Sequence, residues 1–324
     1  MDCNGPGMTR RRRGRGFSYQ DEDGTRIEDP EVLDRIRTLA IPPAWTDVWI
    51  CSDPRGHIQA TGLDARKRRQ YRYHQLWQEE RAAEKFDRIL RFAKQLPALR
   101  VQIASDLALD GMPRDRVLAC AVRLLEVGCF RVGGETYASE NGSYGLATIR
   151  KEHVRVKANA LLFDYDAKSG QHLQRIVVDD DVLAVVRTLR RRRTGAKDEL
   201  LAYHDGRRWV DVTSGDINDY LHRHLGDEFS AKDFRTWVGT VLTAVVLADR
   251  DRPSSAAGRR KLVREAVAEV AEHLGNTPAV ARSAYIDPRV VERFEDDDTI
   301  ARALDAVELE TIERAVLRLV RRAG

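Results

Sequence analysis

The sequence predicts an α+β protein in which a small β-rich domain precedes a larger, mainly α-helical domain. Residues 17–77 consist of short alternating segments separated by turns, a texture typical of small sheets. After residue 77 apolar residues recur at helical spacing, and residues 153–178 alternate as a β-hairpin or three-stranded sheet. A chain of 324 residues is long enough for two domains, each with its own core.

The domain boundaries follow from these changes of pattern. Residues 1–16 are rich in glycine and arginine, and we expect them to be a disordered basic arm. The β-rich domain should then cover residues 17–77, and the mainly helical domain should cover residues 78–324.

Positive charge is concentrated in three arginine-rich runs, at residues 10–13, 66–69 and 190–193. The net charge is only +4, but 33% of the residues are charged and the isoelectric point is near 8.9. Such runs usually lie on solvated surfaces or in tails. Three of them on one basic chain favour a polyanionic partner, and nucleic acid is the foremost candidate.

The cysteines and the hydropathy argue against several classes of protein. Cys3, Cys51, Cys120 and Cys129 show no CxxC spacing and no paired histidines, so we expect neither a metal site nor a disulfide framework. No stretch approaches the roughly 18 consecutive apolar residues of a membrane span, and the arginine-rich start lacks the apolar segment of a signal peptide. We therefore expect a protein of the reducing cytoplasm with no membrane partner.

A basic and aromatic segment at residues 64–74 is a candidate contact for nucleic acid. Its sequence, DARKRRQYRYH, interleaves cations with two tyrosines and a glutamine. The cations could bind phosphates while the glutamine and the aromatic edges approach bases. The alternative is an edge strand that its charges protect from unwanted pairing. The candidate contact residues are Arg66, Lys67, Arg69, Gln70, Tyr71 and Tyr73.

An arginine inside an apolar helix is the first candidate for chemistry. Ser230, followed three residues later by Asp233, predicts a capped helix start, and apolar residues then recur at helical spacing as far as Val246. Arg235 lies within this run. A buried guanidinium is costly unless an anion meets it, and its donors fit two oxygens of a phosphate. The alternative is a structural ion pair with a carboxylate elsewhere in the chain.

A tyrosine follows the abrupt end of the next helix. That helix is predicted over residues 258–274; Gly275 ends it, and Thr277 caps a short helix that begins at Pro278. Tyr285 lies about two helical turns past this corner. A tyrosine at such a position more often packs than reacts, so the other residues must decide between the two interpretations.

Two further cations lie at the boundaries of predicted elements. Arg131 follows a predicted helix over residues 114–127, and Lys168 lies at the turn of the predicted hairpin. A lysine at a hairpin tip is ordinarily a solubilising surface residue. Gly133 and Gly134 are too weak a signal for a phosphate loop, because no G-x-x-x-x-G-K motif follows a strand here.

Taken together, these residues suit the transesterification of a phosphodiester without a metal ion. Two arginines and an amide can stabilise the charge that develops on the non-bridging oxygens. A tyrosine, whose ordinary pKa is about 10, would be the nucleophile, and positive charge nearby would favour its phenolate. A lysine on a hairpin could protonate the departing sugar oxygen. The candidate set is Arg131, Lys168, Arg235, Asn276 and Tyr285.

Long, ordered motifs give the chain a resemblance to a known family. It resembles the type IB DNA topoisomerases, in particular the compact poxvirus-like bacterial ones. The likeness spans nearly the whole chain beyond the first 16 residues, and it is carried by IPPAWTDVWI, DARKRRQYRYH, FRVGGETYASENGSYGLATIRKEHV, KDFRTW and GNTPAVARSAYI. The resemblance implies the catalytic fold that these enzymes share with tyrosine recombinases.

The resemblance also implies roles for the candidate residues. Tyr285 matches the nucleophile that forms a 3′-phosphotyrosyl bond and frees a 5′-hydroxyl. Arg131 and Arg235 match the two arginines that stabilise the pentavalent phosphorane. Lys168 resembles the general acid on the hairpin.

The sequence departs from the family pattern at two positions. Ala167 stands where a glycine usually precedes the lysine, which leaves the register of the hairpin open. Asn276 falls where many relatives place a histidine that hydrogen-bonds a non-bridging oxygen. Asparagine can donate the same bond but carries no charge, so we expect it to stabilise less.

By the same resemblance, we expect a monomer that closes around double-stranded DNA as a clamp and lets the nicked duplex swivel before religation. Neither ATP nor a metal is required, because the covalent link retains the bond energy. Tyr137 joins the expected DNA contacts, and the protein is expected at the nucleoid.

Two other functions are compatible with parts of the pattern. A tyrosine recombinase uses a similar set of residues, but recombinases typically carry H-x-x-R where this chain has Lys232, Asp233, Phe234 and Arg235. A DNA-binding module without catalysis is the second alternative, and in such a module Tyr285 would only pack.

Overall fold

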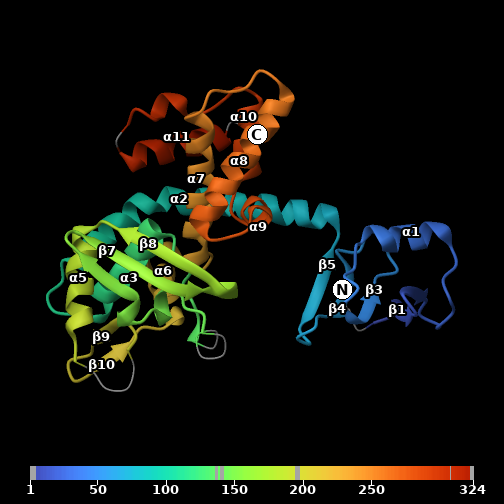
Figure 1. The fold of residues 1–324 in the computed structure, drawn as a ribbon, viewed down its shortest axis with the longest axis horizontal. Coiled ribbons are helices and arrows are strands. Elements are labelled where there is room, and N and C mark those ends of the chain that lie inside the picture. Colours follow the sequence, from blue (N-terminus) through green and yellow to red (C-terminus); the bar gives the residue numbers. More distant parts are fainter. Residues whose placement is uncertain (1–4, 136–137, 139–141, 194–197, 307, 322–324) are drawn as a thin grey trace. The chain divides into compact units, whose positions relative to one another are not determined.

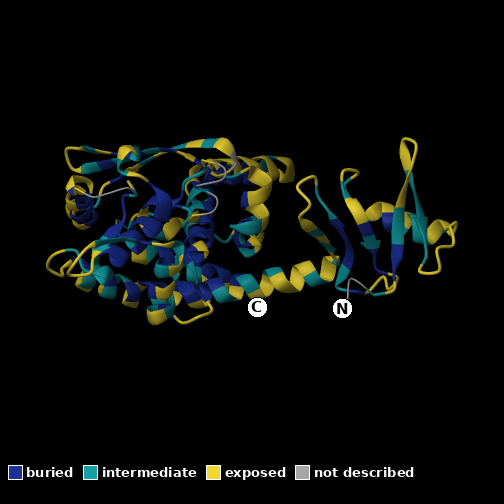
Figure 2. Cartoon of the chain, turned by 90° about the horizontal axis from the view of Figure 1, so that it is seen from below, coloured by how far each residue is buried: buried dark blue, intermediate teal, exposed yellow. Residues whose placement is uncertain are grey.

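The computed structural model describes residues 5–135, 138, 142–193, 198–306 and 308–321. The chain divides into two compact units, residues 1–87 and 88–324. The expected boundary after residue 77 falls inside the long helix α2, Gln75–Leu107, which is unbroken on both sides of it. The first turns of α2 are largely exposed, and its buried residues begin at Phe86 (Figure 2).

The smaller unit is built on an antiparallel five-stranded sheet. Its strand order is β2-β1-β3-β4-β5, and the short helix α1, Pro30–Thr38, is capped by the Asp29 carboxylate, which accepts from the Glu31 amide at 2.8 Å. Met8, Ile36, Val48, Ile50 and Ala60 form its buried core. The strands are β1 Met8–Arg13, β2 Gly16–Gln20, β3 Thr46–Ile50, β4 Ile58–Leu63 and β5 Arg69–Tyr73.

The prediction of a disordered arm over residues 1–16 is wrong for residues 8–13, which form β1 between β2 and β3. The contacts of Arg10 explain why this strand is ordered. Its guanidinium donates to the carbonyls of Pro42 at 3.1 Å and Trp45 at 2.7 Å, and it lies 4.2 Å from the centre of the Phe17 ring. The composition suggested disorder, but long-range pairing and these contacts give the arginine-rich segment a fixed place.

The larger unit is mainly helical (Figure 1). Its helix α3, Arg114–Gly128, belongs to the core and is buried at almost every position from Val117 onward. Helices α5 Asp180–Arg191, α6 Ser214–Leu225 and α7 Ala231–Ala248 pack against it. The remaining helices are α8 Ala256–Leu274, α9 Pro278–Ala284, α10 Pro288–Glu295 and α11 Leu309–Arg321. A 3₁₀ turn at Ala301–Ala303 lies between α10 and α11.

A three-stranded antiparallel sheet is the main β element of this unit. Its order is β6-β7-β8, with β6 Val154–Lys157, β7 Ala160–Ala167 and β8 Gln171–Val177. A small hairpin pairs β9, Ala202–His204, with β10, Trp209–Asp211. These elements confirm the predicted α+β class, with a β-rich unit before a mainly helical one. No helix within the described ranges is both long and apolar enough to cross a membrane.

Candidate active site

A pocket of about 250 Å³ in the larger unit brings together residues from distant parts of the sequence. Four of the five residues proposed for chemistry line it, namely Arg131, Lys168, Arg235 and Tyr285. The remaining wall is formed by Val132, Gly133, Gly134, Ser143, Tyr144, Ala231 and Lys232. The fifth candidate, Asn276, is bonded to Arg131.

The start of α7 is fixed by a capping box. The Asp233 carboxylate accepts from the backbone amide of Ser230 at 2.8 Å, and it also pairs with Arg88 of α2 at 2.7 Å. Asp233 is almost completely buried, so removing Arg88 would leave a buried charge without its cationic partner. The capping box and the ion pair hold the turn of α7 that carries Arg235.

Arg235 is buried, with 3% of its surface exposed, and it bridges the ends of two helices. Its guanidinium donates to the Cys129 carbonyl at the end of α3 at 2.5 Å and to the Leu274 carbonyl at the end of α8 at 2.6 Å. Helix C-termini carry partial negative charge, which stabilises a cation there. The partners of Arg235 in the described structure are thus backbone carbonyls, not the carboxylate that a structural ion pair requires.

Arg131 lies in the extended segment after α3 and contacts the same corner of the chain. Its Nη2 donates to the Gly275 carbonyl and to the Asn276 side-chain oxygen, the latter at 2.8 Å. Burial and the neighbouring Arg235 lower the pKa of Arg131 below its ordinary value. An arginine remains charged despite such a shift, so the two guanidinium groups repel each other unless an anion binds.

Two glycines allow the segment after Arg131 to fold tightly. Gly133 has a positive φ of 84°, and a Cβ on Gly145 would lie 2.3 Å from the Gly133 Cα. The Leu146 amide donates to the Arg131 carbonyl at 2.8 Å across this contact. The glycine pair therefore serves close backbone packing beside the pocket.

The turn after α8 has the helix end and the helix cap that the sequence predicted. Gly275 ends the helix in the left-handed conformation with φ of 60°, and Thr277 caps α9 by accepting from the Val280 amide. Tyr285 follows α9, and its ring lies 5.2 Å from the Arg235 guanidinium carbon. Gly239 on α7 permits this approach, since a Cβ there would be 2.6 Å from the Tyr285 carbonyl oxygen.

Lys168 begins the 3₁₀ turn Lys168–Gly170 between β7 and β8, as the hairpin prediction required. The register across this turn is regular, with Ala167 opposite Gln171. Ala167 has φ of −100°, a conformation that needs no glycine, so this departure from the family pattern leaves the hairpin intact. The Tyr144 amide donates to the Asp166 carbonyl at 2.9 Å and ties the hairpin to the pocket wall.

The electrostatics of the pocket favour an anion. Arg131, Lys168, Lys232 and Arg235 bring four cations, and no carboxylate is found among the described residues that line it. Three buried donors, Arg131 Nη1, Arg235 Nε and Asn276 Nδ2, have no hydrogen-bond partner in the described structure. Buried guanidinium nitrogens without a partner also occur away from the pocket, but here a bound oxyanion would supply the acceptors.

The sequence patterns did not indicate Lys232 and Tyr144 as pocket residues. Lys232 precedes Arg235 by three residues, a spacing that places both on one side of a helix, so this neighbour could have been found. Tyr144 gave no local signal, because only the folding of the 131–147 segment brings it to the pocket. Among the residues whose positions are described, no cluster of three His, Cys, Asp or Glu side chains could hold a metal ion.

Residues 69–73 of the basic and aromatic segment form the edge strand β5. Tyr71 and Tyr73 are both exposed, and their rings stack with centroids 5.9 Å apart. Gln70 donates to Asp64 at 3.1 Å. Arg66, Lys67, Arg68 and Arg69 are exposed at this edge, and Arg68 pairs with Asp64 at 2.8 Å. Tyr137, the remaining expected contact, lies outside the described residues.

Comparisons with known proteins define the class. The family model described as eukaryotic DNA topoisomerase I, catalytic core, matches residues 74–308, and the one described as bacterial DNA topoisomerase IB, N-terminal domain, matches residues 16–64. The chain therefore belongs to the type IB DNA topoisomerases, which are isomerases that act on DNA.

Two relatives show how far this similarity extends. The chain is 30% identical to DNA topoisomerase 1B of Acanthamoeba polyphaga mimivirus over 299 residues, which is 90% of this chain and 88% of the relative. It is 28% identical to DNA topoisomerase 1 of Candidozyma auris over 130 residues, covering 40% of this chain but only 16% of the longer relative.

Proposed function

We propose that this enzyme relaxes supercoiled duplex DNA by transient cleavage of one strand through a 3′-phosphotyrosyl intermediate at Tyr285. The observation that carries the proposal is the pocket in which a tyrosine lies beside four cations, with no carboxylate among its described lining residues. The tyrosine oxygen attacks the phosphorus, the bond to the 5′ oxygen breaks, and the freed 5′-hydroxyl later reverses the step. The bond energy is retained, so the cycle needs neither ATP nor a metal.

Arg131, Arg235 and Asn276 bind the non-bridging oxygens, which gain charge in the transition state. Their unpaired donors, Arg131 Nη1, Arg235 Nε and Asn276 Nδ2, supply this binding. The carbonyls that already hold the guanidinium groups fix these donors before DNA arrives, which lowers the cost of organising the site. Asn276 adds a hydrogen bond without adding charge.

Lys168 is the general acid that protonates the departing 5′ oxygen. Two features support this role, namely its position at the start of the hairpin turn and its place in the pocket lining. The turn allows the ammonium group to reach a leaving group that lies on the far side of the phosphorus from Tyr285.

The two units close around the duplex as a monomeric clamp, and the smaller unit binds through the β5 edge. Arg66, Lys67 and Arg69 bind phosphates, while Tyr71 and Tyr73 offer an exposed aromatic surface. Gln70 reads a base edge after release from Asp64. Tyr137 contributes a further contact to the DNA.

Relaxation of supercoiled plasmid by the purified chain, in EDTA and without ATP, tests the proposal directly. We expect relaxed topoisomers and, after trapping with detergent, protein attached to the 3′ end of the nick through the peptide that contains Tyr285. A tyrosine recombinase that needs a synaptic multimer would not relax plasmid as a monomer. Absence of both relaxation and covalent adduct would contradict the proposal.

Replacing Lys168 with alanine should slow cleavage of ordinary DNA by about 10²-fold to 10⁴-fold, the range typical for a general acid. The same variant should cleave a substrate with a 5′-bridging phosphorothiolate at nearly the wild-type rate, because a thiolate leaves without a proton. Single-turnover cleavage of the two substrates measures this difference. Equal slowing on both would remove Lys168 as the acid.

A further inference from the structure

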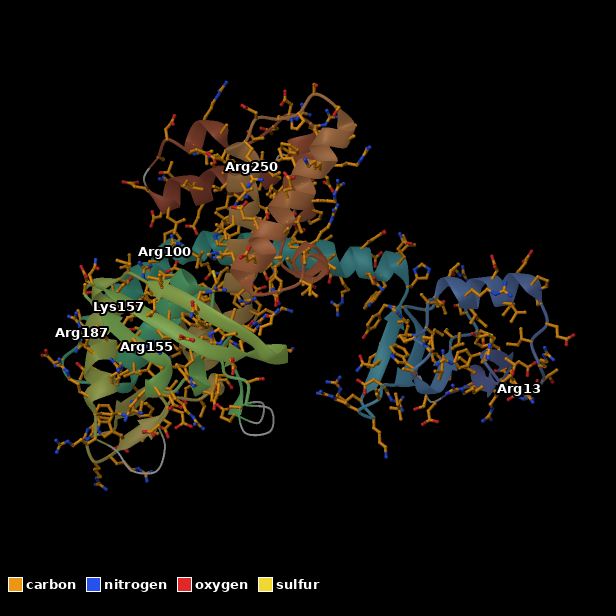
Figure 3. All side chains as sticks on the ribbon, viewed as in Figure 1. Arg13, Arg100, Arg155, Lys157, Arg187 and Arg250 are labelled. Atoms are coloured by element: carbon orange, nitrogen blue, oxygen red, sulfur yellow. The ribbon has the colours of Figure 1, made fainter. Side chains whose placement is uncertain are left out.

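A chain of buried and partly buried ion pairs crosses the larger unit and uses no residue that lines the pocket. At its centre is Arg100 of α2, labelled in Figure 3. Arg100 makes a bidentate pair with Glu313 of α11, at 2.7 and 3.0 Å, and donates to Glu126 of α3 at 2.7 Å. Both carboxylates are 8% exposed, so the pairs that they make with Arg100 are shielded from solvent.

The chain continues from α3 to the end of the sheet that carries Lys168. Glu126 pairs with Arg123 at 2.7 Å, and Arg123 pairs with Asp179 at 2.8 Å. Asp179 follows β8 and caps α5 by accepting from the Val182 amide. Burial alone would lower the pKa of Arg123, but Asp179 and Glu126 together raise it, which is the signature of a well-paired cation.

The other end of the chain reaches the helix of Arg235. The indole nitrogen of Trp237, on α7, donates to Glu313 Oε1 at 2.8 Å. Trp237 is 2% exposed, and this bond is the polar contact that joins its side chain to α11. Glu313 thus accepts from Arg100 and Trp237 together, which links α2, α7 and α11 through one carboxylate.

Trp237 and Arg235 lie on opposite sides of α7. Each residue turns an α-helix by about 100°, so two residues correspond to about 200°. Gly239, one turn beyond Arg235, is on the Arg235 side and packs on the Tyr285 carbonyl, to which the adjacent Thr240 hydroxyl donates at 3.4 Å. The side of α7 that carries Arg235 therefore also packs against Tyr285, while the opposite side is bonded to Glu313 through Trp237.

We propose that Glu313 is a positioning residue, which fixes the rotation of α7 through Trp237 and so sets the Arg235 guanidinium against the phosphate attacked by Tyr285. This inference rests on the proposed function of that site. A helix rotation of a few degrees displaces a long side chain at its tip, and small misplacements in an organised site have large effects on rate. The C-terminal helix α11 thereby contributes to catalysis without contacting DNA at the pocket.

Replacing Trp237 with phenylalanine removes the indole donor and leaves the Arg100–Glu313 pair in place, while the smaller ring also leaves a cavity at this buried position. We expect the single-turnover cleavage rate to fall at least about tenfold, with the Kd for duplex DNA within about twofold of wild type. Glu313→Ala should give a similar loss, while Glu313→Gln, which keeps an oxygen acceptor for Trp237, should recover most of the rate. Glu310→Gln is the matched control, since Glu310 is half exposed and lies 3.8 Å from the same arginine.

Combining Trp237→Phe with Arg235→Ala distinguishes a positioning role from general destabilisation of the fold. If Trp237 acts through Arg235, the double variant should be no slower than Arg235→Ala alone. A wild-type cleavage rate in Trp237→Phe, a loss explained by weaker DNA binding, or full additivity in the double variant would overturn the inference. A different result, covalent adduct formation in Tyr285→Phe, would contradict the proposed function. Failure of the inference and failure of the proposed function can therefore be told apart.

Discussion

Replacing Tyr285 with phenylalanine should abolish the covalent adduct and the relaxation of supercoiled plasmid while leaving DNA binding intact. The substitution removes only the oxygen that we assign as the nucleophile. The ring remains to pack 5.2 Å from the Arg235 guanidinium, so the site keeps its shape. Detergent trapping on labelled duplex DNA measures the adduct, and a binding titration of the same duplex measures affinity.

Tyr203→Phe is the control for Tyr285→Phe. Tyr203 belongs to β9 in the same unit and is absent from the pocket lining, so loss of its hydroxyl should leave cleavage unchanged. Adduct formation that survives in Tyr285→Phe would show that another residue is the nucleophile. Unchanged relaxation would favour a DNA-binding module in which Tyr285 only packs.

Replacing either arginine of the pocket with alanine should slow cleavage by about 10²-fold to 10³-fold, which corresponds to roughly 3 kcal/mol of transition-state stabilisation. The expected loss follows from removing a fixed cationic donor where negative charge develops. Arg131→Ala tests the half-buried member, and Arg235→Ala tests the buried one. Single-turnover cleavage at saturating enzyme separates this loss from a loss of affinity.

Arg235→Ala has a second effect that must be measured separately. It leaves the carbonyls of Cys129 and Leu274 without their donor, which should cost about 1 to 3 kcal/mol of stability for each buried group. Thermal unfolding reports this cost. Arg116→Ala is a matched control, since the Arg116 guanidinium donates to the exposed Gly111 carbonyl at 2.9 Å and does not line the pocket. Near-normal cleavage in Arg131→Ala and Arg235→Ala would refute their assigned roles.

Local chemistry made several elements of the site predictable. Three helix ends could be placed from sequence, because the residues at each end satisfy backbone groups within a few positions. These are the start of α7 at Ser230 and Asp233, the end of α8 at Gly275, and the start of α9 at Thr277 and Pro278. The turn at Lys168 was predictable for the same reason. The long-range consequences of these elements were not, because Lys232 and Tyr144 join the pocket only through packing.

Residues 8–13 show the opposite case. The composition of a run of arginines predicts disorder when its partners are unknown. In the fold this segment pairs with β2 and β3, and Arg10 donates to carbonyls more than thirty residues away. Likewise, α10 and α11 both pack against α7, an arrangement that the periodicity of either helix does not specify.

The sequence by itself determined the two-part α+β class, the helix ends, the family and the identity of the five candidate residues, because each depends on neighbours within a short stretch or on ordered motifs. Only the tertiary structure decided that two guanidinium groups meet at the end of α8, that Tyr285 lies over one of them, and that Glu313 is tied to the opposite side of α7. These contacts join residues as many as 145 positions apart. Their formation depends on which helix faces are buried together, and that is a property of the whole packed chain.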